Sequence, residues 1–286
     1  HNYDLYYFDF LGIPYFIPLV QMMLPKEKCI IAAHNVKTPK GARYYWMAKP
    51  YMDYIVKVYR NFQVFSINQL DLLKSLNSKA NILYAPLCLK DYGKPTVEKD
   101  RLPITFLFFG NIVEYKRVDL LLEAIRLLEK KGVADFKVQI SGYCRHDKWV
   151  SKYAPLMKGL KNVSVDIRRI PNEEIPNLFE KSHYFVMPYQ DIAQSGAMTV
   201  ALYYNIPIIA SELETFKEFM NGVNDGYFFQ MGSAVKLAET MLKAIEEYNT
   251  RYTNMRICQA KLVKEKLSTD AILNQYRQYI DKLCHI

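Results

Sequence analysis

Signatures of metal-binding and disulfide-rich proteins are missing from this sequence of 286 residues. There is no CxxC, HExxH or cysteine–histidine cluster, and the five cysteines are widely scattered: Cys29, Cys88, Cys144, Cys258 and Cys284. Neither a zinc site nor a disulfide framework is therefore expected. Unpaired thiols of this kind are typical of a reducing compartment, so we expect a cytoplasmic protein.

Short motifs for several common activities are also missing. The sequence has neither GxGxxG nor GxxxxGK followed by serine or threonine, which argues against ordinary dinucleotide and P-loop chemistry. Without a GxSxG elbow, no serine–histidine–aspartate triad can be assembled. Helix-turn-helix, RNP-like and zinc-finger patterns are absent too, so we expect no nucleic-acid partner although the formal net charge is +9.

The sequence also lacks a long hydrophobic run. Its most apolar stretch extends from Phe10 to Leu24 and is interrupted by Pro14, Pro18 and Gln21. It is too short and too interrupted for a membrane-spanning helix. We interpret it as a buried helix or as a strand with a loop.

Positive charge is concentrated between Lys26 and Arg60. This segment has eight lysines and arginines against two acids, and it carries six aromatic residues: Tyr44, Tyr45, Trp46, Tyr51, Tyr54 and Tyr59. Basic residues among aromatics suit a phosphate-rich partner or a membrane surface. A solvated helix face with a half-buried aromatic side has the same pattern. We hypothesise that residues 26–60 make a peripheral contact with anionic lipid at the inner membrane face.

Short apolar runs alternate with amphipathic segments along the whole chain. The expected strands are YDLYYFDF, CIIAAHN, FQVFSI, NILYAPL, ITFLFFG, FKVQISG, NVSVDI, HYFVMP, IPIIAS and GYFFQ. The expected helices cover residues 50–60, 69–76, 118–128, about 143–159, 172–181 and 195–204, together with the last fifty residues. Such alternation predicts an α/β fold with doubly wound parallel sheets, which bind ligands outside the carboxyl ends of their strands.

Residues 89–103 form the expected linker. Their sequence, LKDYGKPTVEKDRLP, is rich in charge, contains glycine and proline, and has neither a helical nor an alternating pattern. We therefore predict two domains, residues 1–95 and residues 96–286.

Two loops have the composition of an anion site. The first, GNIVEYKRVD, follows the strand ITFLFF, and its Gly110 lets the backbone turn closely around a ligand. Lys116 and Arg117 stand at the start of the next helix, where cations oppose the helix dipole and a bound anion would offset that cost. Two ordinary surface cations are the alternative.

The second loop, QSGA, precedes another helix. Ser195 can cap that helix, which leaves the backbone N–H groups of Gly196, Ala197 and Met198 facing a phosphate. A plain helix cap is the alternative. His34 ends the strand CIIAAHN, where a histidine is either structural or turned towards a cleft.

The order of these segments is similar to that of glycosyltransferase family 4, also called glycosyl transferases group 1. ITFLFFGNIVEYKRVDLLLEAIRLL resembles the start of the family's donor-binding domain, and VSVDIRRIPNEEIPNLFEKSHYFVMPY and SGA…IPIIAS resemble its downstream loops. The resemblance extends from about Ile104 to Lys217. It is weaker in the first domain, where IIAAHNV is similar to the family's strand that ends in histidine.

The resemblance implies a GT-B fold, with two Rossmann-like domains facing across a cleft and a C-terminal helix that often returns to the first domain. It implies sugar transfer from a nucleotide-sugar donor with retention of configuration, and no cofactor or obligatory metal. By the resemblance, Lys116 binds the diphosphate and His34 lies near the reacting sugar. The other residues that it places around the donor are Gly110, Asn111, Arg117, Gln194, Ser195, Gly196 and Ala197.

The sequence departs from the family pattern in three respects. Asn111 replaces the usual arginine, which removes a permanent charge that Arg117 could supply instead. Ile192 and Val200 stand where the family has a pair of glutamates eight positions apart, although QSGA resembles a family variant with an SQSG-like sequence. The family's first strand and glycine-rich loop do not precede YDLYYFDF, and the first residue is His1, so we expect a fragment with an incomplete N-terminal domain.

Two functions follow as hypotheses. The first is a retaining glycosyltransferase of surface polysaccharide or glycan biosynthesis, with a saccharide or lipid-linked acceptor. The second is a non-catalytic glycosyltransferase-like subunit that binds a glycan or a protein partner through the same cleft.

Overall fold

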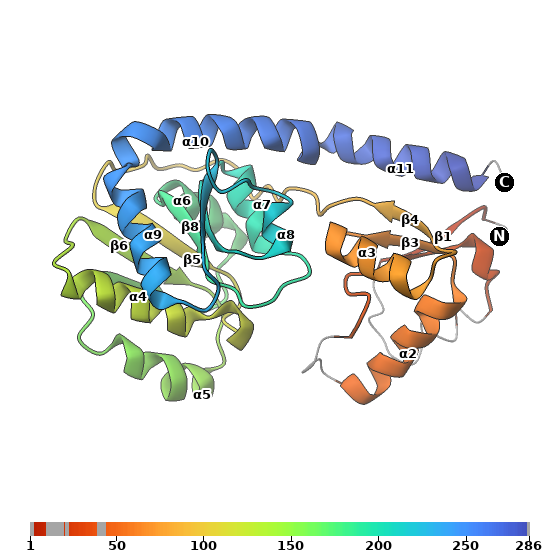
Figure 1. The fold of residues 1–286 in the computed structure, drawn as a ribbon, viewed down its shortest axis with the longest axis horizontal. Helices are drawn as coiled ribbons and strands as arrows, with labels where there is room; N and C mark the ends of the chain where they lie inside the picture. The colour runs from red at the N-terminus through yellow and green to blue at the C-terminus, as the bar shows by residue number, and fades with distance from the viewer. Residues whose placement is uncertain (1–2, 10–19, 21–22, 39–43, 285–286) are drawn as a thin grey trace. The chain divides into compact units, whose positions relative to one another are not determined.

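The computed structural model describes residues 3–9, 20, 23–38 and 44–284 (Figure 1). Most of the apolar stretch from Phe10 to Leu24, and part of the basic segment, lie outside these residues. The chain divides into two compact units. Unit 1 consists of residues 1–88 and 266–286, and unit 2 consists of residues 89–265.

Unit 1 has a parallel sheet whose strands follow one another in sequence order. The strands are β1 (Tyr6–Phe8), β2 (Cys29–Ala32), β3 (Asn61–Val64) and β4 (Asn81–Tyr84). All four correspond to predicted strands. The connections contain a 3-10 turn, η1 (Lys26–Lys28), and two helices, α2 (Tyr45–Val58) and α3 (Ile67–Leu76). Helix α2 begins before the predicted start at Pro50, because the proline lies inside the helix instead of at its first turn.

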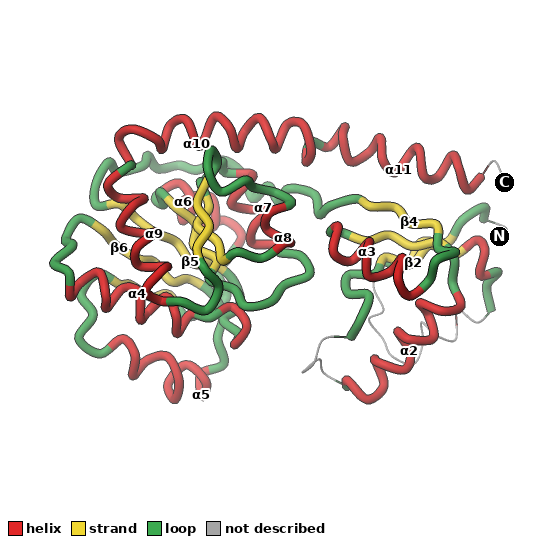
Figure 2. Tube along the Cα trace, in the orientation of Figure 1, coloured by secondary structure: helices red, strands yellow, loops and turns green. Residues whose placement is uncertain are grey.

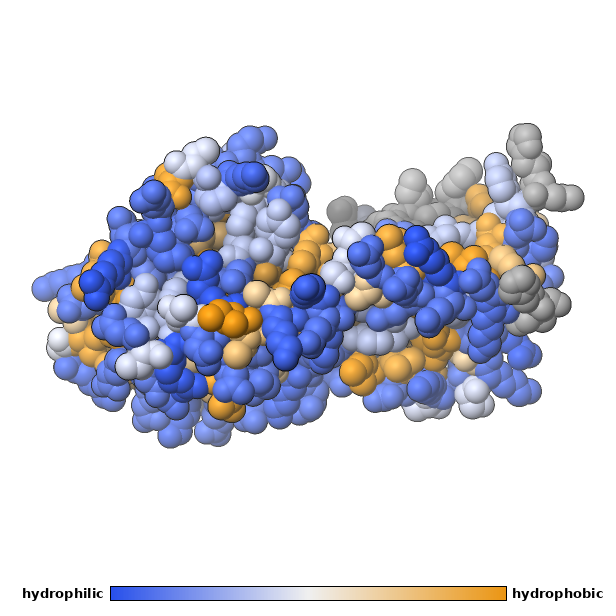
Figure 3. All heavy atoms as spheres, turned by 90° about the horizontal axis from the view of Figure 1, so that it is seen from above, coloured by the Kyte–Doolittle hydropathy of each residue, from blue (hydrophilic) through white to orange (hydrophobic). Residues whose placement is uncertain are grey.

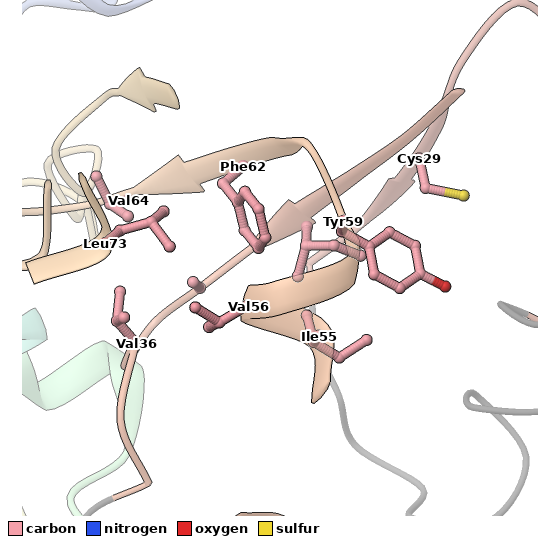
Figure 4. Packing of buried hydrophobic residues seen from close by; sticks show 10 residues of the cluster. Cys29, Val36, Ile55, Val56, Tyr59, Phe62, Val64 and Leu73 are labelled. Carbon is pink, nitrogen blue, oxygen red and sulfur yellow. The ribbon is translucent and has the colours of Figure 1, made fainter. Parts of the chain in front are cut away.

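Helices α2 and α3 bury apolar side chains against this sheet. Figure 4 shows Ile55 and Val56 of α2 and Leu73 of α3 around Phe62 and Val64 of β3. All five are at most 4% exposed. Burial of one such side chain stabilises a fold by about 1.5–3 kcal/mol, so this cluster contributes substantially to the stability of the unit.

The last helix, α11 (Thr269–Cys284), belongs to unit 1. Its Tyr279 packs against Ile30, Leu83 and Ala85, and the Tyr279 hydroxyl donates a hydrogen bond of 2.9 Å to the Asn81 carbonyl oxygen. The compact units therefore differ from the predicted domains 1–95 and 96–286. The first unit ends at residue 88, and it also contains the end of the chain.

Unit 2 has a six-stranded parallel sheet in the order β10-β9-β8-β5-β6-β7. Its strands are β5 (Ile104–Phe109), β6 (Phe136–Ser141), β7 (Val163–Asp166), β8 (Tyr184–Met187), β9 (Ile208–Ser211) and β10 (Gly226–Phe229). All six were predicted. The chain starts in the middle at β5, adds β6 and β7 on one side, and then crosses back to β8. This is the strand order of a Rossmann fold, and β5 and β8 flank its topological switch point.

Helices cover both faces of this sheet. They are α4 (Val118–Lys130), α6 (Ile175–Glu180), α7 (Gly196–Tyr203), α8 (Glu214–Lys217), α9 (Ala234–Glu246) and α10 (Tyr248–Leu262). Helix α4 packs beside α9 and buries the predicted stripe, including Leu121, Ile125 and Leu128. The segment before Gly159 is not one helix. It contains α5 (His146–Lys148), a π-helical turn (Trp149–Tyr153) and a 3-10 turn (Ala154–Met157) that includes Pro155.

The predicted linker has no regular secondary structure and is attached to unit 2 (Figure 2). The Tyr204 hydroxyl donates to the Gly93 carbonyl oxygen at 3.0 Å, and the Thr96 N–H donates to the Asn177 side chain at 2.7 Å. Further along, the Lys99 ammonium donates to the carbonyl oxygens of Glu180 and Ser182. Residues 89–99 are thus fixed to one domain and do not form a free tether.

The surface of unit 2 in Figure 3 is mainly hydrophilic, with hydrophobic side chains in small separate groups. No helix in the described part of the chain combines the length and apolarity that a membrane crossing requires.

Candidate functional site

Two loops of unit 2 meet at the carboxyl ends of β5 and β8, where a doubly wound sheet binds its ligands. Gly110 follows β5 with φ of +115°, a conformation that favours glycine. A Cβ atom placed on Gly110 would lie 3.2 Å from the Lys116 ammonium and 4.0 Å from Cβ of Ala197. The structure therefore brings together the GNIVEYKR loop and the start of α7, as the sequence predicted.

The turn after β5 is held by close backbone contact with the turn after β6. A Cβ atom on Gly142 would lie 1.9 Å from the Gly110 carbonyl oxygen, so only glycine fits there. Gly142 has φ of +149°, and the Gly110 N–H donates to the Ser141 carbonyl oxygen at 3.0 Å. Gly142, which directly follows β6, therefore fixes the shape of the Gly110 turn.

Lys116 lies in a 3-10 turn, η2 (Glu114–Lys116), and its side chain is only 8% exposed. Its ammonium lies 5.2 Å from the centre of the Tyr189 ring. Within the described residues it has no ion pair or hydrogen bond. Burial lowers the pKa of Lys116 to about 8, because the charged form has lost its hydration. A bound anion would supply the missing partner.

Arg117 is already paired. Its guanidinium binds the Asp119 carboxylate at 3.0–3.1 Å, and it lies 3.5 Å from Oε1 of Gln190. The hydrogen bond to Asp119 raises the pKa of Arg117. Asp119 is in the first turn of α4, where a carboxylate is favourable. The Asp119 carboxylate therefore balances the positive charge of Arg117 at this helix start, a role that the sequence analysis assigned to a bound anion.

The opening of α7 has the predicted cap. Oγ of Ser195 accepts a hydrogen bond of 3.2 Å from the Met198 N–H, so the prediction that this N–H faces a phosphate is wrong. The N–H groups of Gly196 and Ala197 have no intrahelical partner, as at any helix start, and both residues are only partly buried. Gln194 directly precedes the cap. The cap and the donor groups thus coexist, as the anion-site interpretation requires.

Lys90 is a neighbour of the site that the sequence analysis did not single out. A Cβ atom on Gly196 would lie 3.2 Å from the Lys90 ammonium, so this lysine borders the first turn of α7. It belongs to the predicted linker, where its only signal was one positive charge among several.

The three residues that depart from the family pattern, Asn111, Ile192 and Val200, belong to the two loops of this site and to helix α7. Asn111 is exposed directly after Gly110. Ile192 is partly buried, and its carbonyl oxygen accepts a hydrogen bond of 2.9 Å from the Thr215 hydroxyl. Val200 is 1% exposed inside α7. Neither position offers a carboxylate to a ligand.

His34 lies in unit 1, after β2. Its Nε2 atom lies 3.0 Å from the Asp9 carbonyl oxygen and 3.3 Å from the Asp9 carboxylate. The imidazole stacks on Phe65 with ring centres 4.5 Å apart. Asp9, His34 and Phe65 follow β1, β2 and β3, so they share the carboxyl edge of the unit 1 sheet. The sequence analysis did not single out Asp9, since one acid after a strand carries little information.

The basic–aromatic segment has both exposed and paired groups. Trp46 is 74% exposed on α2, and Tyr54 is 42% exposed. The Lys26 ammonium lies over the Tyr54 ring, and Lys49 pairs with Asp53 at 2.7 Å on the same helix. Residues 39–43 of the segment lie outside the described residues. Over the whole described part of the chain, no group of three or more histidines, cysteines and acids could hold a metal ion.

Comparison with known families identifies the chain. The model of "Glycosyl transferases group 1" matches residues 94–257, which is more than half of the sequence and includes Gly110, Lys116 and Gly196. Among proteins with curated descriptions, none matches.

Solved structures share the fold at low identity. Sucrose-phosphate synthase from Thermosynechococcus elongatus is similar with a TM-score of 0.79 and 13% identity, over 98% of this chain and 74% of that one. HepE from Anabaena, in complex with UDP and glucose, has a TM-score of 0.76 and 12% identity, over 99% and 78%. The pneumococcal O-GlcNAc transferase GtfA, in complex with UDP and GlcNAc, has a TM-score of 0.70 and 14% identity, over 90% and 53%. The two parallel sheets of this chain are thus those of a GT-B fold.

Proposed function

The chain belongs to the glycosyl transferases group 1 and is by family and fold a nucleotide-sugar-dependent glycosyltransferase, and from this premise we propose that it transfers a sugar with retention of configuration. The proposed acceptor is a saccharide or a lipid-linked saccharide, and the proposed role is in surface polysaccharide or glycan biosynthesis. We further propose that the protein acts in the cytoplasm.

The observation that carries this proposal is that Lys116 is buried without a counter-charge. A buried lysine beside Gly110 and the start of α7 has no acidic partner among the described residues. Burying an unpaired charge is unfavourable, and a protein that does so usually has a ligand of opposite charge at the site. The free N–H groups of Gly196 and Ala197 point to the same chemistry, because phosphates bind at helix starts. A nucleoside diphosphate satisfies both.

In transfer, the bond between the sugar's anomeric carbon and the diphosphate oxygen breaks, and its electron pair stays on the leaving diphosphate. Lys116 would stabilise the negative charge that develops there, which is where a fixed cation lowers the barrier most. The acceptor hydroxyl oxygen bonds to the anomeric carbon, and its proton passes to an oxygen of the leaving diphosphate. By the family resemblance, we place His34 near the reacting sugar, with Asp9 and Phe65 orienting the imidazole.

The test is a panel of UDP-, GDP- and ADP-sugars. We expect one nucleoside diphosphate to raise the melting temperature of the chain, and its sugar conjugate to be a donor in a transfer assay with saccharide and lipid-linked acceptors. The anomeric configuration of the product, read by NMR, tests retention. Absence of both a thermal shift and transfer over the whole panel would contradict the proposal.

A non-catalytic subunit is the second candidate. The observation that favours it is the pair Ile192 and Val200, which removes the carboxylates that normally place the donor. It predicts that Lys116→Ala keeps full biological activity. The first candidate predicts that this variant loses both diphosphate binding and transfer.

We also propose that residues 26–60 contact a membrane that carries the acceptor. The exposed Trp46 and the cluster of lysines in this segment support the proposal. Co-sedimentation with liposomes should then require anionic lipid and fail at high salt. Equal binding to neutral and anionic vesicles would contradict it.

A further inference from the structure

We propose that Lys90 is a second diphosphate-binding residue, and that it supplies from the linker the positive charge that Asn111 lacks. This inference rests on the proposed function, since it concerns the same donor site. Lys90 lies outside the family-matched residues 94–257.

The contact with α7 is the first observation. The Lys90 ammonium lies 3.2 Å from the place that a Cβ atom of Gly196 would occupy. Lys116 lies nearby, since a Cβ atom on Gly110 would be 3.2 Å from its ammonium and 4.0 Å from Cβ of Ala197, the next residue of the same helix turn. Two ammonium groups therefore border one helix start, which is itself the positive end of the helix dipole.

Lys116 bears the cost of this arrangement in the absence of an anion, because it is buried, whereas Lys90 is exposed and hydrated. No acid forms an ion pair with either lysine within residues 44–284, where the structure describes the surroundings of both. The neighbouring acid, Asp91, is already engaged: it accepts a hydrogen bond of 2.7 Å from the Gly93 N–H, and a hydrogen bond from Tyr203 helps to lower its pKa. Lys116 is only 8% exposed, so its charged form has lost most of its hydration. A counter-charge would therefore stabilise Lys116 even without the effect of the helix dipole.

The linker holds Lys90 in place. The Tyr92 N–H donates to the Tyr204 hydroxyl at 3.2 Å, and that hydroxyl donates to the Gly93 carbonyl oxygen at 3.0 Å. Tyr204 follows the last residue of α7, whereas Lys90 reaches Gly196 at its first. The backbone around residue 92 is thus bound at one end of the helix, and the Lys90 side chain reaches the other end.

Lys90 compensates for the positive charge that is missing at Asn111. The position after the strand-end glycine, where the family usually has arginine, is the neutral Asn111. Arg117 does not replace it freely, because Asp119 binds its guanidinium. Lys90 restores a second cation, so that the two phosphates of a nucleoside diphosphate have two ammonium groups and the amides of α7 as partners.

The experiment measures diphosphate affinity by calorimetry on the full chain. Among UDP, GDP and ADP, the one that binds the wild type most tightly is used, together with its monophosphate. Lys90→Gln should weaken the diphosphate at least about tenfold, as expected for loss of a charge-assisted hydrogen bond. It should weaken the monophosphate less, and Lys90→Arg should retain most of the affinity.

Lys94→Gln is the matched control. Lys94 is exposed in the same linker, and its replacement changes the net charge equally. If Lys90→Gln binds the diphosphate as Lys94→Gln does, the role of Lys90 is overturned while the proposed function stands. If the wild type binds none of the three diphosphates, the proposed function itself fails. Equal melting temperatures of the free variants show that folding is not the cause of any difference.

Gly196→Ala supplies a second, independent test. Its methyl group would push the Lys90 ammonium away by a few tenths of an ångström without breaking the helix, because alanine is favourable in helices. The variant should weaken diphosphate binding when Lys90 is present and have a smaller effect beside Lys90→Gln. Additive losses would show that Lys90 acts away from α7, contrary to the proposal.

Discussion

The Lys116 ammonium lies 5.2 Å from the centre of the Tyr189 ring, at the edge of the sheet where β5 and β8 end. Tyr189 is fully buried, so the aromatic face replaces part of the hydration that the lysine has lost. The replacement is partial, since the pKa of Lys116 is still lowered to about 8 by burial. The free protein therefore loses stability at the place where it would bind an anion.

The first prediction concerns Lys116→Met. Lowering the pKa from 10.5 to about 8 corresponds to a penalty of roughly 3 kcal/mol for the charged lysine below pH 8. The variant should unfold at higher urea concentration than the wild type at pH 7 and lose diphosphate binding. Lys130→Met, at an exposed position on α4, should change neither. A less stable Lys116→Met protein would show that the lysine has a partner that stabilises it.

The second prediction concerns the pH dependence of binding. Below about pH 8 the free protein has Lys116 charged and ready for the diphosphate, and above that pH it must take up a proton to bind. The dissociation constant should therefore rise about tenfold between pH 7 and pH 9. Lys116→Arg should remove this rise, because arginine stays charged. A wild-type constant that is the same at both pH values would contradict the assignment.

The third prediction concerns Gly142. Gly142→Ala would place a methyl group 1.9 Å from the Gly110 carbonyl oxygen, so the donor-site turn must move. We expect a loss of about 3 kcal/mol or more in the free energy of unfolding, together with weaker diphosphate binding. Gly159→Ala is the control, since Gly159 also has positive φ but nothing within 4 Å of the added atom. It should lose only about 1–2 kcal/mol, and equal losses in urea unfolding would contradict the role of Gly142.

The fourth prediction concerns acid stability and His183. This residue is fully buried, and burial together with the nearby Lys99 charge lowers its pKa to about 4. A lowered histidine pKa means that the unfolded chain binds the proton first. Stability contributed by the neutral imidazole is therefore complete above pH 6.5 and is lost as pH falls towards 4, by about 3 kcal/mol.

His183→Asn tests this prediction. Asparagine can still accept the hydrogen bond of 2.9 Å that the Thr105 N–H donates to Nδ1 of His183. In urea unfolding between pH 7 and pH 4, the variant should lose less stability than the wild type. His146→Asn, at an exposed site, should follow the wild type. Equal slopes for all three proteins would show that His183 does not carry the acid sensitivity.

The strands and most helices could be predicted from the sequence, because local patterns encode them. Runs such as ITFLFF are apolar at five of six positions, as is typical of strands buried on both faces. The stripe of Leu121, Ile125 and Leu128 has the spacing of one helix face. The segment ending near Gly159 was predicted to be helix-like, and residues 146–157 are helical, but their bonding changes from α to π and then to 3-10, with Pro155 in the 3-10 turn.

Only part of the candidate site could be predicted from local sequence patterns. Gly110, Lys116, Ser195 and Gly196 belong to recognisable loops after strands, and the strand order brings those loops together. Lys90 lies more than a hundred residues from Gly196 along the chain, so no local pattern connects them. The same holds for Asp9 and His34, which meet only because β1 and β2 pair in parallel.

The sequence by itself determined the α/β class, the family resemblance and the residues of the two donor loops, because periodicity and motif order are properties of the chain alone. Tertiary structure decided how the charges are used. It buried Lys116 without a counter-charge, paired Arg117 with Asp119 and brought Lys90 to the start of α7. Solvation and pairing of a charge depend on neighbours that folding supplies, and for Lys116 and Lys90 these neighbours come from distant parts of the sequence.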